Sequence, residues 1–310
     1  MKIAFMFAGQ GSQTVGMGKD LYQEYEEFRD VFDILPEKQR EIAWNGPEDE
    51  LNDTGNTQPI MLAFGLGVYQ ILASPGIQPD MAAGLSLGEY TALAAAGVFP
   101  PEEAVPLVTF RAEVMKNAAA GVDPEMTAVM GLSVEMVEEL CQKISTEQCR
   151  AEITNLNCPG QVIVSGDREA VERVSTMALE NGARRCMKLS VSGPFHTSYM
   201  IPAGEALKAR FRSVEFGEPA FTILYNCLGK EKQPEDRIQD LLVRQVSTGV
   251  QMESILRNII EAGVDCIVEI GPGRTLAGFV RKIDRSVECI SITTTEDVKK
   301  VLALLSEEAN

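Results

Sequence analysis

The segment Gly84-Leu85-Ser86-Leu87-Gly88 restricts what this chain can fold into more than any other feature. It follows a short, mostly apolar run at 79–83 and precedes an alanine-rich stretch, 89–96, with no helix breaker before Gly97. This order predicts a buried strand, a sharp turn at Ser86 and a helix, an arrangement that exposes a serine hydroxyl at the end of a strand. The flanking glycines suit a strained turn in which the backbones pass closely.

The composition narrows the class of protein. Hydrophobic residues make up 45% of the 310 positions and charged residues 24%, as in globular proteins, and the formal net charge of −17 argues against a nucleic-acid partner. Seven cysteines, an odd number without C-x-x-C spacing, argue against a disulfide framework and a structural zinc site. We therefore expect buried thiols, no metal and no cofactor.

The N-terminal apolar run is too short for a signal peptide, and the glycine-rich segment 9–13 interrupts it. Since no segment approaches 18 uninterrupted apolar residues, nothing is expected to span a membrane. The sequence predicts a cytoplasmic protein.

Strand-like and helix-like segments alternate along the chain, which indicates an α/β fold with a parallel sheet. Before residue 125 we expect a strand at 3–7 and helices at 17–32, 57–72 and 101–118. After residue 189 we expect helices at 197–211, 235–245 and 252–262, strands at 221–225 and 266–270, and a helix after Gly271-Pro272-Gly273.

The middle of the chain has a different order. Strands are expected at 126–132, 151–155, 162–165 and 184–189, with helices at 133–144 and 168–181, which is the β-α-β-β-α-β order of a ferredoxin-like unit. The predicted architecture is a hydrolase-like large subdomain, residues 1–124 and 190–310, with an inserted ferredoxin-like small subdomain, residues 125–189.

A serine nucleophile needs a base, and the chain contains one histidine, His196, in the segment that leaves the insert. No acidic residue stands out as the third member of a triad. Arg111 lies on the predicted helix 101–118 among apolar residues. Two interpretations of Arg111 are equally good: its stem covers an apolar surface, or its guanidinium binds a substrate carboxylate.

Motifs spread over nearly the whole chain resemble those of the malonyl-CoA:acyl carrier protein transacylases. Residues 7–13 (Phe-Ala-Gly-Gln-Gly-Ser-Gln) are similar to the Phe-Pro-Gly-Gln-Gly-Ser-Gln of that family, and residues 84–89 are similar to its Gly-His-Ser-Leu-Gly-Glu. The remaining matches, in the family's order, are Thr57-Gln58-Pro59, residues 155–161, Ser192-Gly193-Pro194-Phe195-His196, Asn226 with Gly229, Gln245, and residues 269–273.

The resemblance implies a ping-pong transfer of a malonyl group from malonyl-CoA to the phosphopantetheine thiol of acyl carrier protein. Ser86 would be the nucleophile and His196 the base, with backbone N–H groups of Gln10 and Leu87 as the oxyanion hole. Arg111 would bind the malonyl carboxylate.

Further roles are implied around these residues. The backbone carbonyl of Gln245 would orient the histidine, which would account for the missing acid. Phe195 would fill the space that an α-methyl group needs. Asn157, Gln161 and Met115 are expected to line the same substrate pocket, with packing or turn roles equally open for Asn157 and Gln161.

Two positions depart from the family pattern. Leu85 replaces the histidine that commonly precedes the nucleophile, and Ala8 replaces the proline of the opening motif. Since Ser86, His196 and Arg111 all remain, we expect activity to be retained.

Acyl carrier proteins are acidic, so docking needs a local basic patch on this acidic chain. The candidates are Arg184, Arg185, Lys188, Arg274, Arg281 and Lys282, for which ordinary solvated charge is an equal explanation. A monomer is expected.

Three alternatives to fatty acid synthesis stay open at this point. They are an acyltransferase of a polyketide pathway, a serine acyl hydrolase on the same nucleophile, and a catalytically silent module that binds carrier protein.

Overall fold

The computed structural model describes residues 1–190 and 192–307. Val191, which belongs to the segment before His196, lies outside the described residues. The main sheet has the strand order β10-β9-β1-β2-β7-β8. The strands are β1 (Ile3–Phe7), β2 (Met81–Gly84), β7 (Thr222–Tyr225), β8 (Lys230–Glu231), β9 (Cys266–Ile270) and β10 (Glu288–Ile292). All neighbouring pairs run parallel except β7 and β8.

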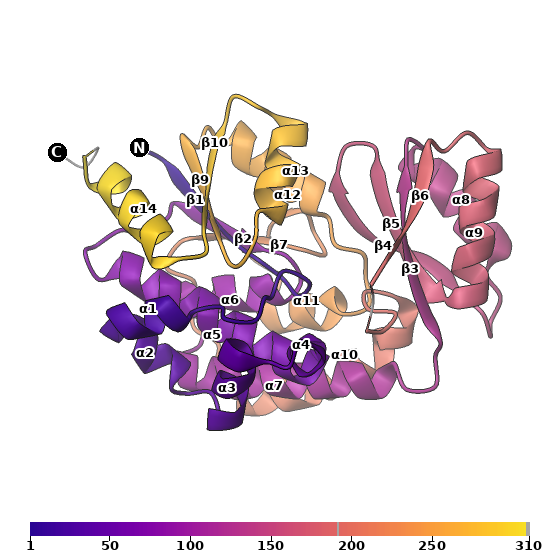
Figure 1. Ribbon diagram of the computed structural model, residues 1–310. Helices are drawn as coiled ribbons and strands as arrows, with labels where there is room; N and C mark the ends of the chain where they lie inside the picture. Colours follow the sequence, from indigo (N-terminus) through magenta and orange to yellow (C-terminus); the bar gives the residue numbers. More distant parts are fainter. Residues whose placement is uncertain (191, 308–310) are drawn as a thin grey trace.

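Strand β1 lies in the middle of this sheet and is buried on both faces. Phe5 and Phe7 join the apolar cluster on the face covered by α5 (Thr54–Ala73), whereas Ala4 and Met6 join the cluster formed with α12 (Met252–Glu261) and α13 (Thr275–Ile283). Figure 1 shows these helices on opposite faces of the sheet. Burial on both faces explains the continuous apolar sequence of the strand.

The expected single helix over 17–32 is wrong. The segment forms α1 (Lys19–Glu24) and α2 (Glu26–Phe32), because Tyr25 between them is extended, with φ −112° and ψ 125°. Glu26 and Glu27 lie in the first turn of α2, where carboxylates stabilise a helix N-terminus and so favour a new start.

The remaining helices of the N-terminal part surround the same face of the sheet (Figure 1). Helix α5 begins before the expected 57–72 range, because the Asp53 side chain accepts a hydrogen bond from the Gly55 N–H and caps it. The other helices here are α3 (Glu37–Asn45), α4 (Glu48–Asn52), α6 (Leu87–Ala95) and α7 (Pro101–Ala118).

A second, four-stranded sheet has the order β4-β5-β3-β6 with antiparallel pairs throughout. Its elements follow one another as β3 (Pro124–Met130), α8 (Val134–Ile144), β4 (Ala151–Cys158), β5 (Gln161–Asp167), α9 (Arg168–Glu180) and β6 (Arg185–Leu189). The ferredoxin-like order is confirmed, with α8 and α9 packed on one face of the sheet. The division of the chain at residues 125 and 189 stays a prediction.

The second sheet is joined to the rest of the molecule through β4. The Leu156 N–H donates to the Val250 carbonyl at 2.9 Å, and the Val250 N–H donates to the Thr154 carbonyl at 2.8 Å. The helices after β6 not yet named are the short helices η1 (Ser198–Met200) and η2 (Phe211–Ser213) and the helices α10 (Ile201–Arg210), α11 (Ile238–Gln245) and α14 (Thr295–Glu307). None of the described helices is both long and apolar enough to cross a bilayer.

Candidate active site

Ser86 lies between the end of β2 at Gly84 and the start of α6 at Leu87, in a positive-φ conformation with φ 53° and ψ −100°. Such a conformation is strained for a residue with a side chain. The two glycines of the motif are needed for space: a Cβ on Gly84 would lie 1.9 Å from the carbonyl carbon of Gly88, and a Cβ on Gly88 would lie 2.2 Å from the Phe7 carbonyl oxygen.

The side chains of Ser86 and His196 meet although they are 110 positions apart, with Oγ 2.7 Å from Nε2. The other ring nitrogen, Nδ1, lies 2.8 Å from the backbone carbonyl oxygen of Gln245. Because a carbonyl oxygen only accepts, this contact places the ring proton on Nδ1. Nε2 is then left as an acceptor that faces the serine hydroxyl.

His196 is buried, and this burial together with the nearby positive charge of Arg111 lowers its pKa to about 4. Both effects disfavour the charged imidazolium. The imidazole is therefore neutral, and able to accept a proton, over the whole range from weakly acidic to neutral pH.

Arg111 projects from α7 into the interior and is fully buried. Its Nη2 atom donates to Ser86 Oγ at 3.1 Å and to Gln245 Oε1 at 3.0 Å, while Nη1 donates to Gln58 Oε1 at 2.6 Å. The guanidinium also lies over the ring of Tyr90, 5.1 Å from its centre. Among the described residues no carboxylate forms a salt bridge with it, and the buried Glu89 interacts with its charge only from a longer distance.

The side chain of Gln245 has a second contact with the turn, since its Nε2 donates to the Ser86 carbonyl oxygen at 2.9 Å. This bond fixes the plane of the peptide between Ser86 and Leu87. Leu87 is the first residue of α6, so its N–H is among those that a helix leaves without an internal partner.

Gln10 lies in the loop after β1, and this loop packs against the serine turn. A Cβ on Gly9 would lie 2.4 Å from the Leu85 carbonyl oxygen, so only glycine permits the approach. The Gln10 side chain donates to Thr54 Oγ1 at 3.0 Å, so it is held at the start of α5.

The residues expected in the substrate pocket are only partly connected to Ser86. Met115 is buried, with its sulfur 3.8 Å from Gln58 Nε2, and Phe195 is half-buried at the rim of the larger apolar cluster. Gln161 accepts a hydrogen bond from Cys158 and lines a cavity of about 380 Å³ beside α12. The described contacts bring neither Asn157 nor Gln161 to Ser86, so their place in the pocket stays a prediction.

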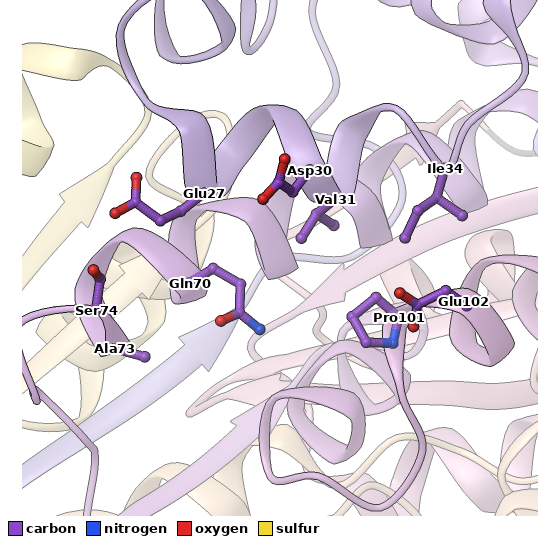
Figure 2. A pocket seen from close by; sticks show the side chains of 9 residues that line it. All are labelled: Glu27, Asp30, Val31, Ile34, Gln70, Ala73, Ser74, Pro101 and Glu102. Carbon is purple, nitrogen blue, oxygen red and sulfur yellow. The ribbon is translucent and has the colours of Figure 1, made fainter.

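A larger cavity of about 440 Å³ lies between α2, the end of α5 and the start of α7 (Figure 2). Three carboxylates, Glu27, Asp30 and Glu102, line it with Gln70, Ser74 and several apolar side chains. It contains none of the residues around Ser86, so we do not assign it to the reaction.

Two groups that the sequence interpretation left without a role belong to the site. Gln58 orients the guanidinium of Arg111, and Asn226 bonds both sides of the serine turn. The signal for Gln58 was present in the sequence: a glutamine next to the long apolar run 59–68 of a helix expected to be buried needs a buried partner.

Comparisons with known proteins place the chain in one family. The acyl transferase domain family matches residues 4–301. A malonyl CoA-acyl carrier protein transacylase of Bacillus subtilis (strain 168) is 36% identical over 99% of this chain and 98% of the relative.

Solved structures of the same family are similar to this chain over nearly its whole length. The malonyl CoA-acyl carrier protein transacylase of Clostridium perfringens superposes with a TM-score of 0.93 at 35% identity, covering 100% of this chain and 98% of that one. A malonyl-transacylase in complex with a type II PKS acyl-carrier protein gives a TM-score of 0.93 at 34% identity, covering 98% and 100%. The chain therefore belongs to the acyl transferase domain family, and within it to the malonyl CoA-acyl carrier protein transacylases.

Proposed function

We propose that this chain transfers the malonyl group of malonyl-CoA to the phosphopantetheine thiol of acyl carrier protein through an ester on Ser86. One observation carries the proposal: a fully buried guanidinium that forms no salt bridge with a described carboxylate lies 3.1 Å from the serine oxygen. A buried positive charge of this kind is matched by an acyl group that brings its own carboxylate, as malonyl does.

In the first half-reaction, Ser86 Oγ attacks the thioester carbonyl of malonyl-CoA while its proton moves to His196 Nε2. The contact of 2.7 Å between the two atoms is within the range for direct proton transfer. The tetrahedral intermediate then collapses, the C–S bond breaks, and the imidazolium returns the proton to the departing sulfur of CoA. The product is malonyl-Ser86.

The negative oxygen of the intermediate needs donors that are already in place. We assign this role to the backbone N–H groups of Leu87 and Gln10, the first at the start of α6 and the second in the loop packed against the turn. Losing one such donor costs about 3 kcal/mol in transition-state stabilisation. The bond from Gln245 to the Ser86 carbonyl supports the first donor, because it holds the peptide plane that contains the Leu87 N–H.

The second half-reaction runs the same steps with a different thiol. His196 removes the proton of the phosphopantetheine thiol, the thiolate attacks the ester carbonyl, and Ser86 leaves with the proton from His196. No described carboxylate is hydrogen-bonded to the imidazole, and this has a physical advantage: the Gln245 carbonyl holds the tautomer without repelling the malonyl carboxylate.

Selection for malonyl follows from Arg111. A neutral acetyl group would leave the guanidinium buried and without a carboxylate, which is costly. We assign Phe195, which is half-buried beside Gly193, to the wall that excludes an α-methyl group. Met115 supports the pocket through its contact with Gln58.

The acceptor would dock on basic side chains near the site. Among the six candidates, Lys188 is already paired with Glu125 and Glu172, both at 2.9 Å, and is the weakest choice. Carrier proteins of fatty acid and of polyketide synthesis both stay open as acceptors. A monomer, a cytoplasmic location and the absence of nucleic-acid binding stay predictions.

The test is to incubate the purified chain with malonyl-CoA, quench it in acid and map the adduct by peptide mass spectrometry. A malonyl adduct on Ser86, lost in Ser86→Ala, is the expected result. The adduct should then pass to a holo carrier protein faster than free malonate appears. Faster release of malonate would indicate a hydrolase, and an adduct that persists in Ser86→Ala would overturn the nucleophile.

A further inference from the structure

Asn226 directly follows β7, and its side chain lies across the turn that carries Ser86. The Ser86 N–H donates to Asn226 Oδ1 at 2.7 Å, and Asn226 Nδ2 donates to the Gly84 carbonyl oxygen at 2.7 Å. The residue is fully buried. One amide group thus bonds the last residue of β2 and the serine two positions later.

The topology explains why a side chain is used here. Strands β2 and β7 run parallel, with Met81 opposite Thr222 and Ala82 opposite Ile223. Beyond these pairs the backbone turns away at Ser86 and cannot continue the ladder. A side-chain amide carries the same donor and acceptor as a peptide, so Asn226 supplies the next rung of hydrogen bonds.

The backbone of Asn226 is held in place by two further hydrogen bonds. The Asn226 N–H donates to Glu89 Oε2 at 2.5 Å, and the Asn226 carbonyl accepts from the Gln251 N–H at 2.9 Å. Glu89 belongs to α6 and is fully buried. All four polar groups of Asn226 therefore have partners, which fixes its position relative to the helix behind the serine.

We propose that Asn226, held by Glu89, is a positioning residue for the transfer reaction: it keeps Ser86 in its positive-φ conformation so that Oγ stays within hydrogen-bond distance of His196 Nε2. The inference rests on the proposed function. Ser86 and His196 are the only described non-glycine residues with positive φ, and strained backbones persist where surrounding bonds hold them. Without the amide, rotation about the serine backbone would move both Oγ and the Leu87 N–H.

Asn226 has no described contact with Arg111, so its loss should act on the rate of the chemical step and spare the binding of the malonyl carboxylate. A displacement of about 1 Å in a reacting group can cost about 10²-fold in rate. We expect Asn226→Ala to lower the single-turnover rate of Ser86 malonylation by about this factor, while KM for malonyl-CoA changes less than about twofold.

The experiment measures malonyl-Ser86 formation by rapid quench and mass spectrometry, with each rate normalised to the fraction of chains that finally become labelled. The matched control is Ser165→Ala, which removes another buried bond from a side chain to a backbone carbonyl, 2.8 Å long, in the second sheet. The control should lower the melting temperature and leave the normalised rate unchanged.

Three further variants decide the matter if Asn226→Ala does not fold. Asn226→Asp keeps an acceptor for the Ser86 N–H but cannot donate to Gly84, so it too should be slowed. Glu89→Gln keeps an acceptor for the Asn226 N–H and should react within about threefold of wild type, whereas Glu89→Leu should be slow. Rescue by the glutamine variant separates positioning from simple loss of stability.

The outcomes are distinguishable. If wild type forms malonyl-Ser86 and the folded Asn226 variants do so at the same normalised rate, the positioning role is overturned. A loss of activity that appears only as a raised KM for malonyl-CoA overturns the positioning role as well. A wild-type chain that is never malonylated at Ser86 overturns the proposed function itself.

Discussion

Nη2 of Arg111 lies 3.1 Å from Oγ of Ser86, so the group that we assign to the substrate carboxylate also donates to the nucleophile. The same atom donates to Gln245 Oε1 at 3.0 Å, and Gln245 in turn holds the Ser86 carbonyl. Carboxylate recognition and the geometry of the serine turn therefore share one network of buried hydrogen bonds.

Removing the guanidinium should change which acyl group is transferred. Arg111→Ala loses a bidentate charge-assisted contact, so malonyl transfer should fall by about 10²-fold or more, while the ratio of acetyl to malonyl transfer rises. Arg111→Lys, which keeps the charge but not the planar fork, should be intermediate. Competition between the two acyl-CoA thioesters measures the ratio, and an unchanged ratio would mean that the carboxylate is held elsewhere.

Loss of the base should be severe because the chain has no other histidine. His196→Ala should reduce malonylation of Ser86 at neutral pH by about 10³-fold, a usual contribution for a general base. Added imidazole should restore part of the rate, since it can occupy the space beside Oγ. A variant that reacts nearly as fast as wild type without imidazole would exclude His196 as the base.

On the acid side, the rate of Ser86 malonylation should begin to fall only at an unusually low pH. Burial, followed by the charge of Arg111, lowers the pKa of His196 to about 4, and the base works only when unprotonated. The rate of Ser86 malonylation should therefore be nearly flat from pH 8 to pH 5.5 and fall only as the pH approaches 4, provided that the protein stays folded. An ordinary histidine would halve the rate near pH 6.5, and that result would contradict the low pKa.

The same lowered pKa has a consequence for stability with a definite sign. The unfolded chain binds a proton at His196 below about pH 6.5, whereas the folded chain does so only near pH 4. This residue therefore makes folding less favourable as the pH falls through that window. His196→Ala should show a smaller loss of unfolding free energy between pH 6.5 and 4.5 than wild type, measured by urea denaturation.

Two glycine substitutions should act in opposite directions. A Cβ at Gly88 would lie 2.2 Å from the Phe7 carbonyl oxygen, so Gly88→Ala must push α6 away from β1 and should cost about 1–3 kcal/mol or more. Gly278 lies in α13 with nothing within 4 Å of its added Cβ, and Gly278→Ala should stabilise by about 0.5–1 kcal/mol. Equal effects in thermal unfolding would refute the close approach at the turn.

Restoring the family histidine should have a small effect on catalysis. Leu85 packs beside the apolar cluster under α12 and α13, and the described contacts of Ser86, His196 and Arg111 do not involve its side chain. Leu85→His should therefore change the malonylation rate by less than about tenfold, or about 1.4 kcal/mol in the barrier. A gain well beyond tenfold would show that the departure at this position limits the enzyme.

The sequence predicted the nucleophile and the base of the site better than the residues that surround them. A glycine-flanked serine between strand and helix, together with a single histidine, left few ways to pair a nucleophile with a base. The role of Arg111 stayed open, because spacing along a helix does not show whether the side chain lies inside or outside. The structure shows it buried against Gln58, Ser86 and Gln245.

The sequence marked Asn226 and Glu89 as matches to the family motifs but could not predict what they contact, for a different reason. Their contacts depend on which strand lies next to β2 and on where the parallel pairing ends, and neither can be read from local periodicity. The two-helix break at Tyr25 was likewise missed, because the apolar spacing of 17–32 is that of one continuous helix. Helices and strands could be predicted where the sequence pattern is local. The hydrogen-bond partners of a residue could not be predicted where they lie far away in the sequence.

The catalytic network draws on Gln58, Arg111, His196 and Gln245, which come from segments separated by nearly two hundred positions and by the whole second sheet. A ribosome-bound chain that has emerged only as far as that sheet carries the serine turn but not its base or the carbonyl that orients it. Nascent chains should therefore be inert toward acyl thioesters until almost the entire polypeptide has been released, and competence should then arrive in a single step.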